Sequence, residues 1–287
     1  MKDIVWIVSY PRSGNTFLRA LLSNYFSDAG RPLTLAEIGA TTIGEHDEQL
    51  WTALTGQAPA DRTIEAQWRN RLAYIEKRRE RAGPEQRFFK AHTLNSTAYG
   101  VPGFAFTPGD RILHVVRHPC DVALSCAAYW GIDQDKAVQR LLNPGLVVNG
   151  KPNHGYEVLG SWEQHTRSWL GASTPPVHRI RYFDLAENTL ETLRGIIAFL
   201  GHEPNPYRLK AAVAFASFDT LSAQEGMFGF VEGQQPQGGQ FFRVGKALQW
   251  PGKLEPEQVR ALTEPVQDVL DDLGFSAFVA QRLAGAA

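Results

Sequence analysis

The chain has 287 residues, of which 43% are hydrophobic and 21% charged, and its formal net charge at pH 7 is -1. This composition is that of a globular protein long enough to bury a core. A net charge near zero gives no sign of a nucleic-acid-binding surface, so any anion site must be local. The apolar runs, such as residues 4–8 and 195–200, are far shorter than the roughly 20 residues that span a bilayer. The first of them also begins too early to leave room for a signal peptide, so we expect a cytoplasmic protein without membrane contact.

Apolar runs typical of buried strands alternate along the chain with segments of helical periodicity. Strands are expected at residues 4–8, 87–92, 111–116 and 177–181. Helices are expected at residues 15–27, 64–81, 119–130, 156–170, 185–200 and 255–273. This alternation predicts an α/β fold with a central parallel sheet flanked by helices.

Two segments lack clear periodicity, residues 143–155 and the Gly- and Gln-rich residues 225–240. Loops of this length in a compact domain are usually lids or binding loops. We therefore expect mobile loops near residues 143–155 and 225–245 that contact a substrate.

The first strand leads into the segment SYPRSGNT at residues 9–16. Gly14 lets the backbone approach a ligand closely, and at Thr16 a helix begins whose free N–H groups favour an anion. In an alignment with the Walker P-loop, Asn15 stands at the position of the lysine, and the cation lies earlier, at Arg12. The segment predicts a site for a nucleotide-linked anion and disfavours an ordinary kinase or GTPase.

A second segment, residues 112–125, combines a strand that ends at Arg117 with a helix that has Pro119 in its first turn. Ser125 lies near two turns into this helix, where its hydroxyl could meet the same anion as Arg117. Either residue alone would more often be a surface or structural residue.

Together the two segments resemble those of the sulfotransferases that use 3′-phosphoadenosine 5′-phosphosulfate (PAPS). In that family a Tyr-Pro-Lys-Ser-Gly-Thr-like turn holds the 5′-phosphosulfate, and a strand followed by Arg-x3-Asp-x3-Ser holds the 3′-phosphate. The resemblance implies a single domain over residues 1–287 with the P-loop NTPase-like sulfotransferase architecture. It further implies that the 3′-phosphate is bound by Arg117 and Ser125, and the 5′ end by Arg12, Ser13, Gly14, Asn15 and Thr16.

The segment FFKAHT at residues 88–93 is similar to the family's Lys-Thr-His segment, in which the histidine is the catalytic base. His92 is therefore the candidate base, with Lys90 and Arg12 stabilising the charge that develops during transfer. An ordinary histidine pKa near ~6.5 suits proton removal at neutral pH. A lone histidine after a strand is more often structural, but the strand-end position and the nearby Lys90 single this one out.

The resemblance extends to three later elements, residues 177–185, residues 217–218 and residues 241–246. It implies that Tyr182 lies beside the nucleotide, that Phe218 stacks on adenine or packs in the core, and that Arg243 and Gly245 grip the 3′-phosphate. The sequence departs from the family pattern at three positions, where Arg12 replaces lysine, Phe17 a stacking tryptophan and Val244 a basic residue. Lys246 could compensate for Val244.

The expected activity is transfer of a sulfuryl group from PAPS, as co-substrate, to a hydroxyl or amine of a small molecule or natural product. No metal is expected, since the sequence has no HExxH or clustered Cys/His pattern and its two cysteines, Cys120 and Cys126, fit reduced packing residues. Two alternatives are a P-loop-type nucleotide or small-molecule kinase and a non-catalytic adenine-nucleotide-binding module. The acceptor and the oligomeric state stay open, although Phe228, Phe230, Phe241 and Phe242 favour a large apolar or aromatic acceptor.

Overall fold

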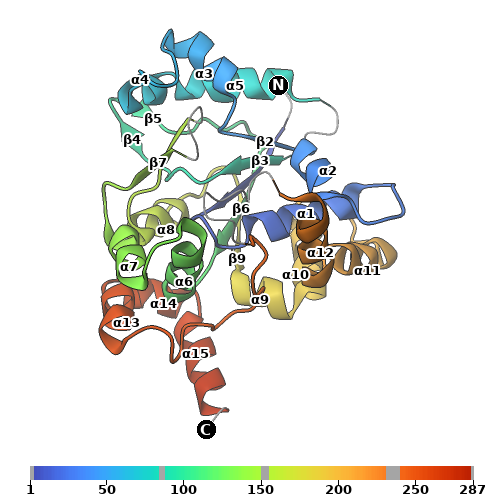
Figure 1. The fold of residues 1–287 in the computed structure, drawn as a ribbon. Coiled ribbons are helices and arrows are strands. Elements are labelled where there is room, and N and C mark those ends of the chain that lie inside the picture. The colour runs from blue at the N-terminus through green and yellow to red at the C-terminus, as the bar shows by residue number, and fades with distance from the viewer. Residues whose placement is uncertain (1–2, 84–87, 150–154, 231–239, 286–287) are drawn as a thin grey trace.

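The structure, a computed structural model, describes residues 3–83, 88–149, 155–230 and 240–285. Its centre is a five-stranded sheet in which all neighbouring strands are parallel (Figure 1). The strand order is β2-β3-β1-β6-β9, with bounds Thr42–Gly44, Phe88–Ala91, Val5–Ser9, Arg111–Val116 and Val177–Arg181. The predicted parallel sheet is confirmed.

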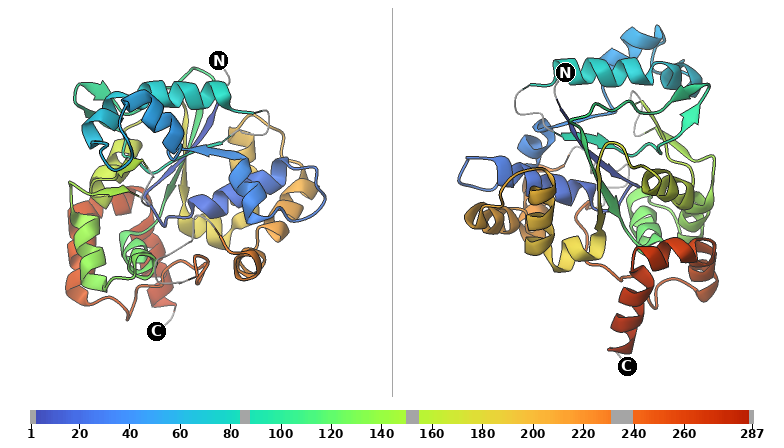
Figure 2. Two further views of the ribbon diagram at one scale, coloured as in Figure 1. Left: turned by 45° about the horizontal axis from the view of Figure 1, so that its top comes forward. Right: turned by 180° about the vertical axis from the view of Figure 1, so that it is seen from behind.

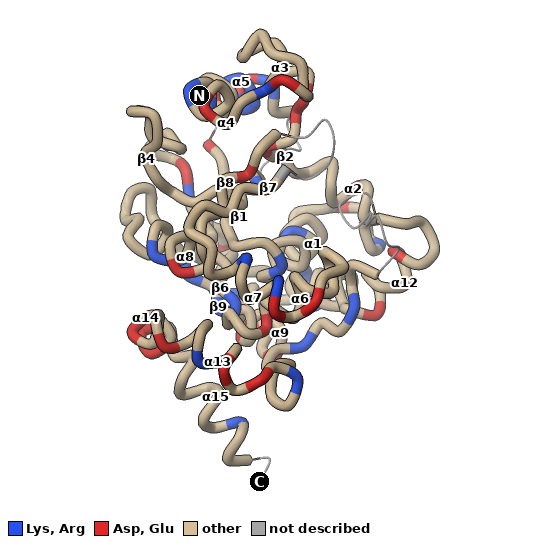
Figure 3. The backbone as a smooth tube through the Cα atoms, turned by 60° about the vertical axis from the view of Figure 1, so that its left-hand side comes forward, with Lys and Arg blue, Asp and Glu red and all other residues tan. Residues whose placement is uncertain are grey.

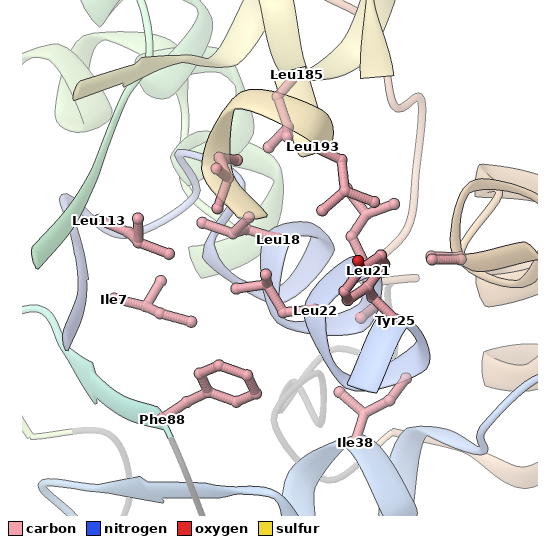
Figure 4. Packing of buried hydrophobic residues seen from close by; sticks show 14 of the residues in the cluster. Ile7, Leu18, Leu21, Leu22, Tyr25, Ile38, Phe88, Leu113, Leu185 and Leu193 are labelled. Atoms are coloured by element: carbon pink, nitrogen blue, oxygen red, sulfur yellow. The ribbon is translucent and has the colours of Figure 1, made fainter. Parts of the chain in front are cut away.

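The central strands are mostly apolar because both faces of the sheet are buried. Ile7 on β1 and Leu113 on β6 point to one face, where they pack in one cluster with Leu18 and Phe88 (Figure 4). Trp6, one residue before Ile7, points to the other face and belongs to a second cluster. Successive side chains of a strand alternate between faces, so one short run of residues supplies both cores.

Helices cover both faces, and the left view of Figure 2 shows the sheet between the two helical layers. One layer consists of α1 (Asn15–Phe26), α2 (Leu35–Ala40), α9 (Tyr182–Glu187), α10 (Thr189–Phe199), α11 (Pro206–Phe215) and α12 (Phe218–Phe228). The other consists of α3 (Glu48–Thr55), α4 (Ile64–Arg69), α5 (Arg71–Arg81), α6 (Pro119–Trp130), α7 (Gln134–Leu142), α8 (Trp162–Leu170), α13 (Pro256–Thr263) and α14 (Gln267–Asp272). The last helix, α15 (Phe275–Ala284), extends from the body towards the C-terminus (Figure 1).

Two antiparallel hairpins complete the fold, β4 (Thr97–Ala98) with β5 (Val101–Pro102) and β7 (Val147–Asn149) with β8 (Tyr156–Val158). The prediction of a helix over 156–170 was therefore wrong in its first part. Residues 156–158 form β8, and the helix begins only at Trp162, where the Ser161 hydroxyl caps it by accepting the Gln164 N–H at 3.1 Å. A serine followed three residues later by glutamine is a capping box, a local signal for this later start.

Other predicted helices are interrupted. The one expected over 64–81 is two helices, α4 and α5, separated at Asn70, whose side-chain amide donates to the Ala66 carbonyl at 2.9 Å. Such a side-chain bond competes with continuous helical geometry. Similarly, α9 and α10 meet at Asn188, and a 3-10 turn that contains Pro265 separates α13 from α14.

The two loops predicted to be mobile are only partly described. The first contains β7, while residues 150–154 lie outside the described part of the chain. The second begins as the last turns of α12, and residues 231–239 lie outside the described part. No helix in the described ranges is long and apolar enough to cross a membrane. Cys120 and Cys126 are buried free thiols, as the sequence predicted.

Candidate active site

Four parallel strands end at the same edge of the sheet, and a candidate site residue follows each of them. Beyond β1 lies the turn of residues 10–14, His92 follows β3, Arg117 follows β6, and Tyr182 follows β9. A cavity of about 830 Å³ opens at this edge. In open parallel sheets ligands bind at the carboxyl ends of the strands, so the topology brings together residues from distant parts of the sequence. Basic positions lie in the middle of the molecule between α1, α6 and β6 (Figure 3).

The turn after β1 depends on Gly14. Its φ is +107°, and a Cβ at this position would lie 2.6 Å from Cδ2 of Tyr182. Gly14 also caps α1 without a side-chain hydrogen bond, so the first N–H groups of this 12-residue helix receive no side-chain acceptor there. Gly14, Asn15 and Thr16 line the cavity, and they expose the positive end of the helix to it.

Asn15 stands at the position of the Walker lysine, but its amide is used within the protein. Its Nδ2 donates to the Ile7 carbonyl at 3.0 Å and lies 3.3 Å from the Ser9 hydroxyl. These bonds tie the start of α1 to β1. Ser13 is buried outside the cavity lining, and its hydroxyl has no hydrogen-bond partner among the described residues.

Arg12 occupies the left-handed region, with φ of 66°, and its side chain reaches α6. The Nε donates to the Ser125 hydroxyl at 3.1 Å and Nη2 to the Phe241 carbonyl at 2.9 Å, with the guanidinium over the rings of Phe241 and Tyr129. Burial lowers its pKa to about 10, so it stays charged at neutral pH. The structure thus brings Arg12 into contact with Ser125. The sequence analysis had assigned Arg12 to the 5′ end of the donor and Ser125 to its 3′-phosphate.

Arg117 completes this basic end of the cavity. Its Nη1 donates to the Arg12 carbonyl at 3.0 Å and its Nη2 to the Lys246 carbonyl at 3.1 Å, while its guanidinium packs 4.2 Å from the ring centre of Tyr182. The Asp121 carboxylate lies 3.9 Å from Arg117 and accepts the backbone N–H groups of residues 248 and 249 at 2.8 and 2.7 Å. Asp121 therefore connects α6 to the segment that follows Gly245.

The residues just before that segment contribute Arg243 and Gly245 to the cavity, next to Phe17 and Phe218. Gly245 has a φ of +68°, and a Cβ there would lie 2.3 Å from Phe218 Cδ2, so only glycine fits against the ring. Lys246 is exposed, and its side chain does not belong to the described lining. Of the predicted site residues, all but Ser13 and Lys246 line the cavity.

His92 is held in one tautomer by its surroundings. Its Nδ1 lies 2.7 Å from the Ser9 carbonyl, so Nδ1 carries the proton and Nε2 is left as the acceptor. The backbone N–H of His92 donates to Glu45 at 3.2 Å, and its carbonyl accepts from His165 at 3.0 Å. Burial lowers the pKa of His92 below its ordinary value, against an opposing effect of Glu157. His92 and Lys90 both line the cavity.

The cavity also contains residues that the sequence analysis did not select, chiefly His46, Tyr129 and Glu157. Oε1 of Glu157 lies 3.0 Å from Nε2 of His46. Glu157 was expected within a helix, where its position relative to His92 could not be inferred. The Ser-x-x-Gln cap at residues 161–164 was the available signal that placed residue 157 before the helix.

Several known proteins are similar to this chain. Sulfotransferase 2A6 of Rattus norvegicus is 24% identical over 166 residues, and sulfotransferase 2A1 of Mus musculus is 25% identical over 169 residues. Each alignment covers 57% of this chain and 57% of the relative. The chain therefore matches a little over half the length of these curated relatives.

Solved structures share the fold. A mouse sulfotransferase, SULT7A1, complexed with PAP superposes with a TM-score of 0.60 and 20% identity, covering 93% of this chain and 84% of that one. Retinol dehydratase in complex with androsterone and the inactive cofactor PAP gives 0.60 and 18%, with 93% and 80% covered. The predicted P-loop NTPase-like sulfotransferase architecture is thereby confirmed. The family profile of the sulfotransferase domain matches residues 2–274, nearly the whole chain, and we conclude that this chain belongs to the sulfotransferase family.

Proposed function

We propose that this chain is an enzyme that transfers a sulfuryl group from PAPS to a hydroxyl or amine of a small-molecule acceptor. The observation that carries the proposal is one cavity with two chemically different ends. At one end lie Arg12, Arg117 and Ser125, which suit a phosphate, and at the other lies His92, whose Nε2 is free to accept a proton. Family membership supplies the reaction class that this arrangement fits.

The basic end has the donors that the 3′-phosphate of PAPS requires. Nη1 of Arg12 is buried and has no hydrogen-bond partner among the described residues, so it has a donor left for an anion. Arg243 lines the same cavity, and Phe17 and Phe218 offer flat apolar faces for adenine. The N-terminus of α1 and Lys90 would bind the 5′-phosphosulfate. From its observed position, Arg12 would bind the 3′-phosphate, and it would need a different rotamer to reach the 5′ end.

His92 would carry the proton transfer. PAPS supplies the sulfuryl group, and Nε2 of His92 accepts the acceptor's proton while the acceptor oxygen bonds to sulfur and the bond from sulfur to the phosphate oxygen breaks. Lys90 and the N–H groups at the start of α1 stabilise the negative charge on the departing phosphate. The Ser9 carbonyl keeps the proton on Nδ1, so Nε2 stays in the form that can accept.

The acceptor would occupy the part of the cavity lined by apolar residues of α6, of the segment that leads into β7 and of β7 itself, namely Trp130, Leu146, Val147 and Val148. Of the aromatic residues that suggested an apolar acceptor, Phe241 and Phe242 line the cavity, and Phe230 packs on both. Phe228 is 72% exposed and lies outside the lining. Retinol dehydratase, a structural relative, is described with androsterone, so an apolar alcohol is a rational first acceptor.

The kinase alternative is less well supported because Asn15, at the lysine position, is bonded to β1. The non-catalytic alternative predicts anion binding with no need for a base. Calorimetric titration with 3′,5′-phosphoadenosine (PAP) and with AMP tests the donor. Charge-assisted hydrogen bonds contribute roughly 1.5–3 kcal/mol each, so PAP should bind at least about 100-fold more tightly than AMP. Comparable affinities would contradict the proposal.

The reaction itself is tested with PAPS and two acceptors, a simple phenol and androsterone, with and without EDTA. We expect sulfuryl transfer that the chelator leaves unchanged, whereas ATP should support no transfer and a kinase would require Mg²⁺. Tight PAP binding without transfer to any acceptor in a wider screen would favour the binding module.

A further inference from the structure

One acidic side chain lies among the basic groups of the cavity. Of the described residues that line it, Glu157 is the only acid, whereas five are lysine or arginine, namely Arg12, Lys90, Arg117, Arg140 and Arg243. Glu157 is 7% exposed. A carboxylate is rarely buried without a function or a partner, and this one faces the space where a proton would be transferred.

The backbone fixes Glu157 close to the segment of His92. The N–H of Leu94, two residues after His92, donates to the carbonyl of Val158 at 2.9 Å. Glu157 is the residue before Val158 on β8, and its Oε1 lies 3.0 Å from Nε2 of His46. These contacts hold the carboxylate at the wall of the cavity that His92 also lines.

The charges around His92 come from several elements. Lys90, on the strand that precedes His92, disfavours the protonated imidazole, whereas Glu157 on β8 and Glu45 after β2 favour it. Glu45 is already neutralised by the buried Arg71. His165 on α8 is buried, and its pKa lies well below its ordinary value, so it adds no positive charge. His46 needs only its neutral form to donate Nε2–H to Glu157, and this leaves the carboxylate's charge in place.

A base in this position becomes a cation during the reaction. Burial and Lys90 both oppose that cation, so a fixed negative charge nearby lowers the energy of the state in which His92 holds the acceptor's proton. Among the carboxylates close to His92, Glu45 forms a buried ion pair with Arg71, whereas Glu157 contacts His46 and lies within the electrostatic reach of both Lys90 and His92.

We propose that Glu157, whose carboxylate contacts His46, is a positioning residue that stabilises the positive charge on His92 as it takes the acceptor's proton. This inference rests on the proposed function, in which His92 is the base. Glu157 itself neither receives the proton nor contacts the sulfuryl group.

The decisive measurement is an NMR titration of the His92 imidazole in ¹³C-histidine-labelled protein, alone and with PAP. The resonance is assigned by its absence in His92→Gln. In Glu157→Gln the midpoint should move to lower pH by about one unit, because the opposing effects of burial and Lys90 remain while the favourable charge is lost. In Glu157→Asp, which keeps the charge, the midpoint should stay close to that of the unaltered protein.

His46→Asn is the comparison variant, in which the titration midpoint of His92 should not move to lower pH. It removes the partner but keeps the carboxylate, so the midpoint should stay or rise. An unchanged midpoint in Glu157→Gln, or an equal downward shift in Glu157→Gln and His46→Asn, overturns the proposal, because a general disturbance of the site would act on both variants alike. PAP affinity, measured in parallel, should be unchanged within about threefold in Glu157→Gln.

Sulfuryl transfer in Glu157→Gln should fall about tenfold at the pH optimum, since one pH unit corresponds to a factor of 10. A shifted midpoint with unaltered turnover would also overturn the proposal. Failure of the proposed function shows differently, because the unaltered protein would then not discriminate PAP from AMP, or His92→Ala would retain full turnover.

Discussion

The tautomer of His92 is set by contacts from outside its own strand. The Ser9 carbonyl, at the end of β1, fixes the proton on Nδ1, and Glu45 and His165 hold the backbone on either side of the ring. Because these contacts come from β1, from the segment after β2 and from α8, a mutation of the ring need not disturb the donor end of the cavity.

His92→Ala should therefore lower turnover by about 10²–10⁴-fold, the usual contribution of a general base, while PAP affinity stays nearly intact. The measurement is steady-state transfer at saturating acceptor, with calorimetry for PAP. His202→Ala is a matched control, since His202 is exposed and does not line the cavity. Near-normal turnover of His92→Ala would show that another group is the base.

Gly14 gives a second prediction at this scale. Alanine at this position would combine a positive φ with a Cβ 2.6 Å from Tyr182. We expect Gly14→Ala to lower the free energy of unfolding by about 1–3 kcal/mol and to weaken PAP binding at least tenfold, because the turn must move. Gly195→Ala on α10, where no atom lies within 4 Å of the added Cβ, should be neutral or stabilising. Urea denaturation and calorimetry measure both variants, and equal effects would contradict the steric argument.

Sequence patterns predicted most site residues because the site is built at strand ends. Arg117, His92 and Tyr182 each follow an apolar run, and parallel strands place such residues at one edge. Arg12 shows the limit of this reasoning. Its place in the turn was predictable, but its contact with Ser125, 113 residues away, depends on packing against Tyr129 and Phe241.

At the scale of elements, the donor end depends on how α6 holds the segment after Gly245. Asp121 accepts two backbone N–H groups of that segment and lies beside Arg117. In Asp121→Asn the side chain keeps its size, but only its Oδ1 can accept, so one N–H loses its partner.

We expect Asp121→Asn to weaken PAP binding by about tenfold, since Arg117 and the backbone of residues 248 and 249, which follows Arg243 and Gly245 in the chain, lose part of their support. Binding of AMP, which lacks the 3′-phosphate, should change less. Calorimetry with both nucleotides measures the difference, and Asp272→Asn, at an exposed position of α14, serves as the control. Equal losses for PAP and AMP would mean that the segment supports the adenosine and not the phosphate.

Elements that depend on tertiary contacts were the ones that sequence could not predict. β2 has only three residues, and it exists because Thr42 to Gly44 pair with β3. β8 is equally short and pairs with β7. A long apolar run such as β6, and a helix such as α6 with proline in its first turn, can be recognised without such a partner, so these two elements were predicted in the right place and of the right type.

On the scale of the whole molecule, three buried histidines besides His92 must stay neutral in the folded state. Burial lowers the pKa of His114 to about 3 and that of His118 to about 4, and it places the pKa of His165 well below the ordinary value. In the unfolded chain all three titrate near ~6.5. Between pH 6.5 and about 4 the unfolded state therefore binds more protons than the folded state.

The free energy of unfolding should consequently fall as the pH is lowered from 6.5, by up to about 1.4 kcal/mol per histidine for each pH unit. Above pH 7.5 these histidines should make it nearly independent of pH. Burial would raise the pKa of Asp110, but its hydrogen bonds, first among them the one from Arg79, lower this pKa to about 2. The stabilising effect of the Asp110 carboxylate is therefore lost only below about pH 4, outside this window. Urea denaturation at pH 7.5, 6.5, 5.5 and 4.5 measures the slope. His118→Gln should reduce the slope, whereas His202→Gln, at an exposed position, should leave it unchanged. A constant free energy of unfolding from pH 6.5 to 4.5 would mean that these histidines gain protons without unfolding, and that the core around Trp169 and Trp250 admits charge.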